Sequence, residues 1–198
     1  MTKKSIRIGA ILLAAGSSSR LGQPKQLLRY KGDFLINYIL RILDQDRLEE
    51  VAVILGANKD LILSILPGST TVIQNESWQQ GMGTSISTGV EYFKNKVDGI
   101  LICLVDQYRI NSAVVNDCIR AFATDPSKVV ACRYDNKIKG PPVIFPKSYF
   151  NQLSILKGSI GARKIIKSIS SHSPTDMILI SFPEGYLDID IPKDLEKL

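Results

Sequence analysis

The sequence has few cysteines, a single histidine and no long hydrophobic run. Its three cysteines are Cys103, Cys118 and Cys132, and they form no Cys-x-x-Cys pair. An odd, widely spaced set of this kind indicates reduced, structural thiols rather than a disulfide framework. The sole histidine, His172, lies in a polar, serine-rich stretch, so we interpret it as a surface residue rather than a catalytic one.

The chain also lacks the features of a secreted or membrane protein. No stretch approaches the roughly 20 apolar residues that a membrane helix needs. The apolar run at residues 8–15 is short and leads directly into a glycine turn, which is not the pattern of a secretory signal. We therefore expect a cytoplasmic protein. The net charge of +6 is spread over scattered lysines and arginines, so charge alone does not predict a nucleic-acid partner.

Short apolar runs alternate with segments of helical periodicity. We expect strands at residues 8–14, 51–55, 71–74, 99–105, 128–134, 142–145 and 177–181. We expect helices at residues 34–43, 60–66, 84–94, 112–122, 147–156 and 161–169, a short one from Pro192, and N-caps at Asn58 and Ser112. This alternation predicts one three-layer α/β/α domain over residues 1–198, with a mostly parallel, twisted sheet. The β-rich stretch at 128–145 breaks the alternation and predicts at least one antiparallel strand.

The loop after the first strand is rich in small and polar residues. It reads Ala14-Ala15-Gly16-Ser17-Ser18-Ser19-Arg20-Leu21-Gly22-Gln23-Pro24-Lys25. Small residues let backbone N–H groups approach an anion closely, and Arg20 and Lys25 add two cations. Sheets of this kind bind ligands at the carboxyl ends of their strands, so this loop predicts a triphosphate site. It has neither the Walker spacing nor the dinucleotide GxGxxG pattern.

Acidic side chains follow at two later positions. Asp106 ends an apolar strand, where a carboxylate is costly unless it is paired, capped or metal-bound. Asp188 and Asp190 offer a second carboxylate near the end of the chain. We expect these two side chains to point to opposite faces of an extended segment, so that only one of them joins Asp106.

Several of these segments resemble one family. The pattern Leu13-Ala14-Ala15-Gly16-x-Ser18-x-Arg20-x-Gly22-x-Pro24-Lys25 resembles the signature loop of the MobA-like NTP-transferase domain. The following Gln26-Leu27-Leu28 is similar to its molybdenum cofactor cytidylyltransferase branch, the MocA-like proteins. Further similar segments follow in the same order, at residues 75–86, 104–107, 140–145, 158–163 and 188–194.

The resemblance implies a Rossmann-like nucleotidyltransferase fold and a Mg²⁺-dependent enzyme. Such an enzyme moves CMP from CTP to the phosphate of molybdopterin and releases pyrophosphate. The implied catalytic residues are Arg20, Lys25 and Asp106, and the implied Mg²⁺ ligands are Asp106 and, in preference to Asp188, Asp190. The implied nucleotide-binding residues are Leu13, Ala14, Ala15, Gly16, Ser17, Ser18, Arg20, Lys25, Asn75, Gly81 and Ser85.

The acceptor side is less fixed by the motifs. Lys139 and Arg163 are candidate acceptor-binding cations, although Arg163 also fits a solvated helix face. The chain departs from the branch pattern at Tyr108-Arg109, Pro141, Ser159 and Lys193. Two alternatives therefore stay open: a cytidylyl- or uridylyltransferase acting on a sugar or alditol phosphate, and a non-catalytic carrier that delivers molybdenum cofactor to an apo-molybdoenzyme.

Overall fold

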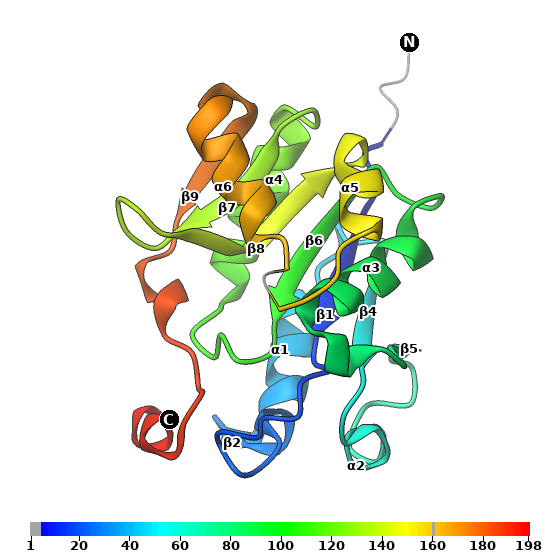
Figure 1. The fold of residues 1–198 in the computed structure, drawn as a ribbon, viewed down its shortest axis with the longest axis vertical. Coiled ribbons are helices and arrows are strands. Elements are labelled where there is room, and N and C mark those ends of the chain that lie inside the picture. Colours follow the sequence, from blue (N-terminus) through cyan, green and yellow to red (C-terminus); the bar gives the residue numbers. More distant parts are fainter. Residues whose placement is uncertain (1–4, 160) are drawn as a thin grey trace.

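A computed structural model describes residues 5–159 and 161–198 (Figure 1). Residues 1–4 of the predicted domain, and Ile160 of the 158–163 segment, lie outside the described residues. The main sheet has seven strands in the order β5-β4-β1-β6-β8-β7-β9. Their bounds are Ile8–Leu13 (β1), Glu50–Leu55 (β4), Thr71–Gln74 (β5), Gly99–Leu104 (β6), Val129–Arg133 (β7), Lys139–Pro146 (β8) and Met177–Ser181 (β9). A hairpin of Arg29–Tyr30 (β2) and Asp33–Phe34 (β3) stands apart from this sheet.

Only β8 runs against the other strands of the main sheet. It is antiparallel to both β6 and β7, while the pairs β5–β4, β4–β1, β1–β6 and β7–β9 are all parallel. The predicted antiparallel strand within residues 128–145 is therefore confirmed, and it is β8.

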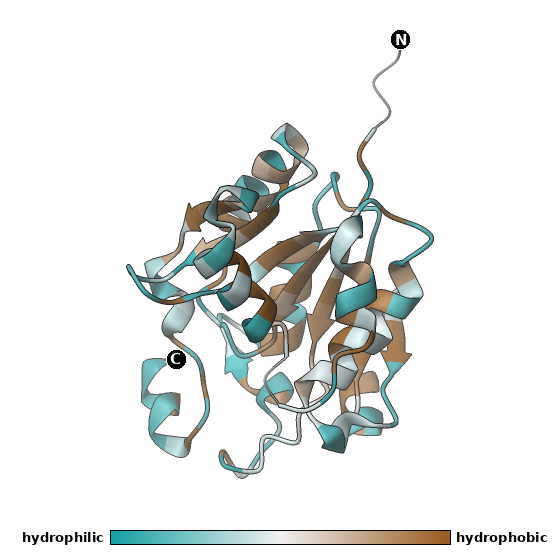
Figure 2. Cartoon of the chain, turned by 45° about the horizontal axis from the view of Figure 1, so that its top comes forward, coloured by the Kyte–Doolittle hydropathy of each residue, from teal (hydrophilic) through white to brown (hydrophobic). Residues whose placement is uncertain are grey.

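Helices cover both faces of the sheet. Their bounds are Leu35–Leu43 (α1), Lys59–Leu63 (α2), Met82–Phe93 (α3), Ser112–Thr124 (α4), Phe150–Ser154 (α5) and Arg163–His172 (α6). Buried side chains of α1, α2 and α4 share one apolar core, and those of α3, α5 and α6 share the other. Figure 2 shows the apolar strands enclosed between these helices. The three-layer α/β/α architecture is confirmed.

The strands form because their side chains suit burial on both faces. In β1, Ile8, Ala10 and Leu12 enter one core, while Ile11 and Leu13 enter the other. Successive side chains of a strand point to opposite faces, so a continuous apolar run fills both cores of a sheet that is covered on both sides.

One predicted N-cap was wrong by a residue. Ser112 is the first residue of α4, and the cap is Asn111, whose side chain accepts a hydrogen bond from the Val114 N–H at 3.0 Å. Asn58 does precede α2, but it has left-handed backbone and makes no side-chain cap bond. A short 3₁₀ helix, Pro192–Lys197, forms the predicted C-terminal element.

The remaining expectations concern single residues and membrane spans. All three cysteines are buried and free, and burial raises the pKa of the Cys103 thiol well above its usual value. His172 is exposed. Within the described ranges, no helix combines the length and apolar character that a membrane span requires.

The strand order places a ligand crevice beside β1. The chain runs outward from β1 to β4 and β5, then crosses back to form β6 on the other side of β1. Open α/β sheets bind ligands at such a switch point, outside the carboxyl ends of the strands. The loops after β1 and β6 lie there. Because β8 is reversed, its beginning lies at the same edge, and so does the segment 182–191 that follows β9.

Candidate active site

The loop after β1 is held by hydrogen bonds to Ser18. The Ser18 carbonyl accepts hydrogen bonds from the N–H groups of Leu21 and Gly22 at 3.0 and 3.2 Å. The Ser18 hydroxyl oxygen accepts one from the Lys25 N–H at 3.1 Å. Ser18 and Gly22 both have positive φ, 55° and 78°, which the tight reversal requires. The loop thus folds back on itself and brings Lys25 toward the carboxyl end of β1.

This loop presents a row of free amides. The backbone N–H groups of residues 15–20 donate to no acceptor in the described part of the chain. Gln26 is 1% exposed, and its Nε2 donates to the carbonyls of Ala14 and Gly16 at 2.6 and 3.2 Å. Since these carbonyls are held by Gln26, the amides that follow are left for an anion. Successive free N–H groups of this kind form a phosphate-binding concavity.

Two cations of the loop pair with acids from distant parts of the chain. Lys25 Nζ lies 2.9 Å from Asp106 Oδ2 and 2.5 Å from Asp190 Oδ1, and Arg20 lies 2.9 Å from Asp190 Oδ2. Burial opposes the charge on Lys25, but Asp106 and Asp190 outweigh it and raise its pKa. The hydrogen bond from Lys25 in turn lowers the pKa of Asp190. The structure therefore brings four predicted residues into one cluster.

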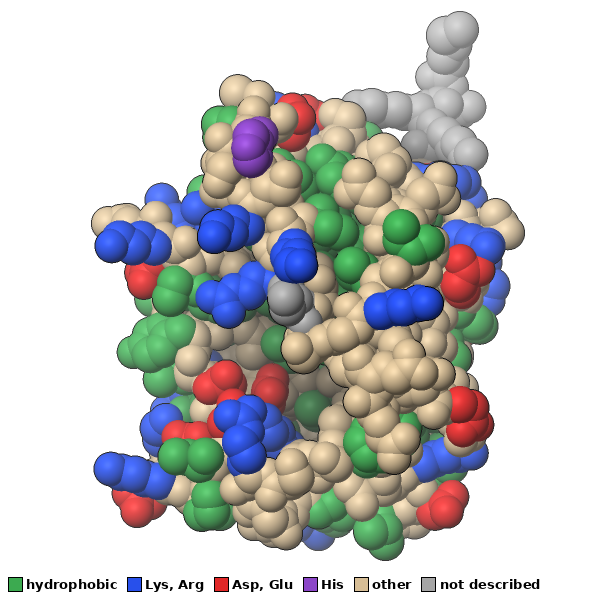
Figure 3. Space-filling view, viewed as in Figure 1, with side chains coloured by type: hydrophobic (Ala, Val, Ile, Leu, Met, Phe, Trp, Pro, Cys, Tyr) green, Lys and Arg blue, Asp and Glu red, His purple; other side chains and the backbone are tan. Residues whose placement is uncertain are grey.

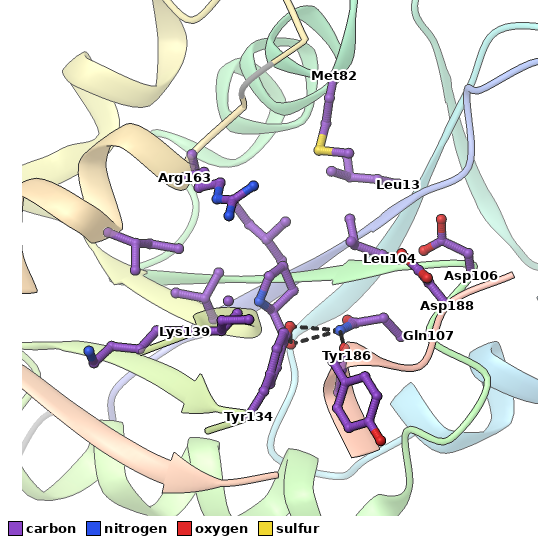
Figure 4. A pocket seen from close by; sticks show the side chains of 18 of the residues that line it. Leu13, Met82, Leu104, Asp106, Gln107, Tyr134, Lys139, Arg163, Tyr186 and Asp188 are labelled. Atoms are coloured by element: carbon purple, nitrogen blue, oxygen red, sulfur yellow. Dashed lines mark hydrogen bonds between the residues drawn. The ribbon is translucent and has the colours of Figure 1, made fainter. Parts of the chain in front are cut away.

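Asp188 also lies beside Asp106, so the expectation that Asp188 and Asp190 point to opposite faces is wrong. Residues two apart in an extended segment share a face, and Ile189 between them is fully buried. Figure 4 shows Asp188 next to Asp106. Burial, followed by the charges of Asp106 and Asp190, raises the pKa of Asp188.

The acidic side chains fit a cation that takes few protein ligands. Asp106 Oδ1 is buried and has no hydrogen-bond partner among the described residues. Within the same residues, no three or more His, Cys, Asp or Glu side chains form a ready metal cage. Mg²⁺ needs only one or two carboxylates when phosphate oxygens and water complete its shell. The donor set is therefore suited to a metal that arrives with a phosphate.

Two cavities meet at this cluster. The smaller, of about 480 Å³, is lined by the loop after β1, by Arg20 and Lys25, and by the start of α3. The larger, of about 660 Å³, has mostly aliphatic walls and extends toward β8 and α6. Both are lined by Leu13, Met82, Leu104, Asp106 and Ser159. A ligand in one cavity would touch a ligand in the other beside Asp106.

Most of the predicted nucleotide-binding residues line the smaller cavity, but Ala14 and Asn75 do not. The Ala14 N–H donates to the Ile54 carbonyl at 3.0 Å, and its own carbonyl is taken by Gln26. Asn75 is 3% exposed and donates 2.9 Å hydrogen bonds to the hydroxyl oxygens of Thr84 and Ser85. Ala14 thus continues the hydrogen bonding of β1 to β4, and Asn75 holds the hydroxyl oxygen of Ser85. Their direct contact with a nucleotide stays a prediction.

Lys139 and Arg163, the two candidate acceptor-binding cations, both line the larger cavity, and their role toward an acceptor stays a prediction. Figure 4 shows them across the cavity from Asp106 and Asp188. Two of the positions that depart from the branch pattern, Pro141 and Ser159, line it as well.

Sequence reasoning missed Gln107, Tyr134 and Tyr186 in this cavity. Gln107 Nε2 donates to Tyr134 Oη at 2.7 Å and to the carbonyls of Gly185 and Pro141 at 2.8 and 3.1 Å. Burial raises the pKa of the Tyr134 hydroxyl above its usual value. The only signal in the sequence was the polar Gln107 directly after a strand-end aspartate, and it does not reveal partners that are 27 to 78 residues away.

Comparison with known proteins agrees with this geometry. Residues 10–175 match the profile of the MobA-like NTP transferase domain. The chain is 29% identical to the purine catabolism protein PucB of Bacillus subtilis, over 94% of this chain and 93% of that protein. It is 27% identical to nicotine blue oxidoreductase of Paenarthrobacter nicotinovorans, over 81% of each. The crystal structure of a Mycobacterium sp. strain JC1 homologue of Rv0371c has the same fold, with a TM-score of 0.81 at 24% identity over 96% of this chain and 93% of that one.

Proposed function

Because the chain belongs to the MobA-like NTP transferase family, we propose that it transfers the CMP half of CTP to the phosphate of molybdopterin and releases pyrophosphate. The observation that carries this proposal is the meeting of two cavities at Asp106. One cavity has the amides and cations of a triphosphate site, and the other has room for a second substrate. Holding two reactants in contact removes much of the entropic cost of their reaction.

The triphosphate would lie along the loop after β1. The free amides of residues 16–20 would bind its oxygens, with Arg20 beside the β- and γ-phosphates and Lys25 beside the α-phosphate. The Arg20 side chain is 72% exposed, so it can turn from Asp190 to a phosphate without breaking a packed core. Lys25 is fixed at the junction of the cavities by its two ion pairs.

Asp106 and Asp190 would hold Mg²⁺ at this junction. The buried, unpartnered Oδ1 of Asp106 supports this assignment. When bound, Mg²⁺ would supply positive charge to the phosphates at the reacting centre. Lys25 already contacts both carboxylates, so the same side chain sets their separation.

The reaction needs no covalent enzyme intermediate. An oxygen of the acceptor phosphate attacks the α-phosphorus, the bond from that phosphorus to the bridging oxygen breaks, and pyrophosphate leaves with the bonding electrons. Lys25 would stabilise the negative charge that develops on the α-phosphoryl oxygens, since a fixed ammonium group in a partly buried site is already oriented for it.

Backbone groups and Ser85 would recognise the base. The Ser85 hydroxyl oxygen accepts from Asn75, which leaves its own hydrogen free to donate. Cytosine presents two adjacent acceptors, O2 and N3, to such a donor. The Ala15 N–H, unpaired among the described residues, lies in the same cavity.

The walls of the larger cavity favour a ring over a polyol. Leu13, Ile86, Ile102, Leu104 and Val143 present hydrocarbon, and hydroxyl groups buried against them would lack partners. A flat pterin ring could place its faces against these walls and keep its polar groups at its edge, whereas a sugar or alditol chain carries a hydroxyl group on most of its carbons. Lys139 and Arg163 provide positive charge for the anionic part of the acceptor.

The test is a pyrophosphate-release assay with Mg²⁺, molybdopterin and each of the four NTPs, followed by identification of the nucleotide in the product. We expect turnover with CTP. Incorporation from GTP alone would overturn the cytidylyl assignment. Turnover with a sugar or alditol phosphate, but not with molybdopterin, would overturn the acceptor.

A further inference from the structure

The positive charge of this protein is concentrated in one stretch of the chain. From Asn136 to Thr175 there is no aspartate or glutamate, but there are seven lysines and arginines. The net charge of the whole chain is +6, so all other residues together carry −1, which is +6 less +7. Lysines and arginines occur along the whole sequence, but the entire net positive charge comes from the region of β8, α5 and α6.

Folding gathers four of these cations around a groove. A cavity of about 480 Å³ lies between α6 and the turn that joins β7 to β8. We call it the basic groove and define it by Lys137, Ile138, Lys139, Arg163 and Lys167. Figure 3 shows Lys and Arg side chains gathered over α6 and this turn, along the rim of the central hollow.

The acidic neighbour of these four cations is Asp135, whose charge acts on Lys137 and Lys139 from beyond ion-pair distance. None of the four forms an ion pair with another residue in the described ranges. The neighbouring acid, Asp135, accepts the N–H groups of Lys137 and Ile138 at 2.6 Å each, and these bonds fix the turn. The groove therefore keeps positive charge for an external anion.

The shape of the groove indicates an extended ligand. Arg163, Lys167 and Ser171 follow one face of α6, and eight residues of helix span about 12 Å. That length exceeds what one phosphate group occupies. Ile138 is 41% exposed and adds an apolar contact between the charges. A peptide that carries both acidic and apolar side chains matches this mixture, whereas a nucleic-acid duplex presents mainly phosphates and sugars along such a track because its bases are stacked inside.

The basic groove also opens into the larger cavity, where the acceptor is proposed to bind. Ile138, Lys139, Arg163 and Ile166 line both spaces. We propose that the basic groove docks an acidic, partly apolar segment of a partner protein, placed where acceptor or product enters or leaves the larger cavity. The docking of such a segment is inferred from the groove itself. The further inference, that the partner exchanges acceptor or product with this protein, rests on the proposed function.

The experiment measures binding of a fluorescein-labelled ten-residue peptide of alternating Glu and Leu to the full chain, by anisotropy at about 0.1 M salt, where surface charges are only partly screened. The variant is the double substitution Lys137→Met and Lys167→Met. The matched control is Lys157→Met with Lys164→Met, which removes the same charge from residues that line another cavity. We expect the first variant to weaken binding about tenfold, since each exposed ion pair contributes modestly, and the control to change it less than twofold.

Several outcomes would overturn the proposal. Equal weakening in both double variants would mean that only net charge matters. Equal binding of a peptide with Gln in place of Glu would remove the electrostatic basis. Tighter binding of a single-stranded oligonucleotide or of anionic vesicles, lost with the same two lysines, would assign the groove to a different partner. No nucleotide or turnover enters this assay, so it stands or falls independently of the transferase reaction.

Discussion

Asp106 lies where the two cavities meet, and its buried Oδ1 has no partner in the described part of the chain. We predict that Asp106→Asn lowers kcat about 10²- to 10³-fold, because it removes a carboxylate that would hold Mg²⁺ and that contacts Lys25 beside the reacting phosphates. Binding of CTP should weaken only severalfold, since the amides of residues 15–20 and Arg20 are untouched. Pyrophosphate release gives the first quantity and calorimetric titration with CTP the second.

The same substitution separates an enzyme from a carrier. A carrier holds finished cofactor and has no turnover for Asp106→Asn to lower. The control is Asp117→Asn, which alters an exposed ion pair with Arg120 on α4. Unchanged turnover in Asp106→Asn, with the control also unchanged, would remove Asp106 from the catalytic residues.

Asp188 and Asp190 should have opposite effects on stability. The pKa of Asp188 is raised, so its ionised form is disfavoured in the folded protein, and stability declines as pH rises from about 4 through its folded pKa. The pKa of Asp190 is lowered, so its ionised form stabilises the fold above about pH 4 and this contribution is lost as pH falls. At pH 7 without divalent ions, Asp188→Asn should therefore stabilise the protein and Asp190→Asn should destabilise it.

Urea unfolding from pH 7 down to about pH 2 measures both effects. The midpoint of Asp188→Asn should rise above that of the native protein as pH rises from about 4, because the raised pKa places this penalty above pH 4. The midpoint of Asp190→Asn should lie below the native one at pH 7 and converge toward it only as pH falls below about 4, because the pKa of Asp190 is lowered. Midpoints that shift in the same direction would contradict the charge arrangement around Asp106. Mg²⁺ added at pH 7 should stabilise the native chain more than either variant, because each has lost a carboxylate of the cluster.

At the scale of elements, the start of α3 depends on close contact with residues 157–159. The Gly83 N–H donates to the Gly158 carbonyl at 2.8 Å, and a Cβ on Gly83 would lie 2.8 Å from backbone atoms of Lys157. We predict that Gly83→Ala lowers the free energy of unfolding by about 1–3 kcal/mol, because a methyl group meets backbone that cannot easily move. It should also raise the KM for CTP, since Met82 and Ser85 of the same helix line the smaller cavity.

Gly68→Ala is the control for this substitution. A Cβ there meets nothing within 4 Å, and its φ lies outside the left-handed region. Urea unfolding and CTP kinetics should leave this variant close to the native protein. Equal loss of stability in the two variants would show that the packing of α3 against residues 157–159 is not what Gly83 serves.

Strands could be predicted from the sequence where burial on both faces requires a continuous apolar run. The runs that became β1 and β6 are apolar on both faces, and each was predicted within one or two residues of its final bounds. The cap of α4 could not be resolved in the same way, because Asn111 and Ser112 are both good capping residues and adjacent in sequence. Backbone conformation decided between them: Asn111 is extended, with φ −143° and ψ 164°.

Apart from Asp190, which the family resemblance implied, the clustered residues were predictable because they lie in loops that follow strands. Arg20, Lys25 and Asp106 come after β1 and β6, so parallel pairing of these strands brings them to one edge. The contacts of Gln107 with Tyr134 and Gly185 depend on where residues 182–191 run after β9. No local pattern reports that path, because it is fixed by buried Phe182 and Ile189 and by the bond from Gln107 to Gly185. The shared face of Asp188 and Asp190, in contrast, follows from the two-residue period of an extended segment.

At the scale of the whole molecule, the site joins segments from opposite ends of the chain. Arg20 and Asp190 are 170 residues apart, and Asp190 lies beyond the part that matches the family profile. Asp194 holds this last segment in place. Its Oδ2 accepts the N–H groups of Asp190 and Ile191 at 2.8 and 3.0 Å, and its Oδ1 pairs with Lys197. The hydrogen bond from Lys197, followed by those from the two amides, lowers the pKa of Asp194, so this anchor stays charged at neutral pH.

We predict that Asp194→Ala releases the C-terminal segment from the bound nucleotide, while the loop after β1 continues to bind it. In the native protein, CTP with Mg²⁺ should slow hydrogen exchange in the loop of residues 14–25 and also in residues 186–194, since both segments meet at the bound phosphates and metal. In Asp194→Ala the first protection should persist and the second should largely vanish, with CTP affinity weakened severalfold. Glu196→Ala, an exposed neighbour in the same 3₁₀ helix, serves as the control and should retain both. Protection of residues 186–194 that survives Asp194→Ala would mean that Lys25 and Arg20 alone hold Asp190, and that the C-terminal helix does not contribute to the site.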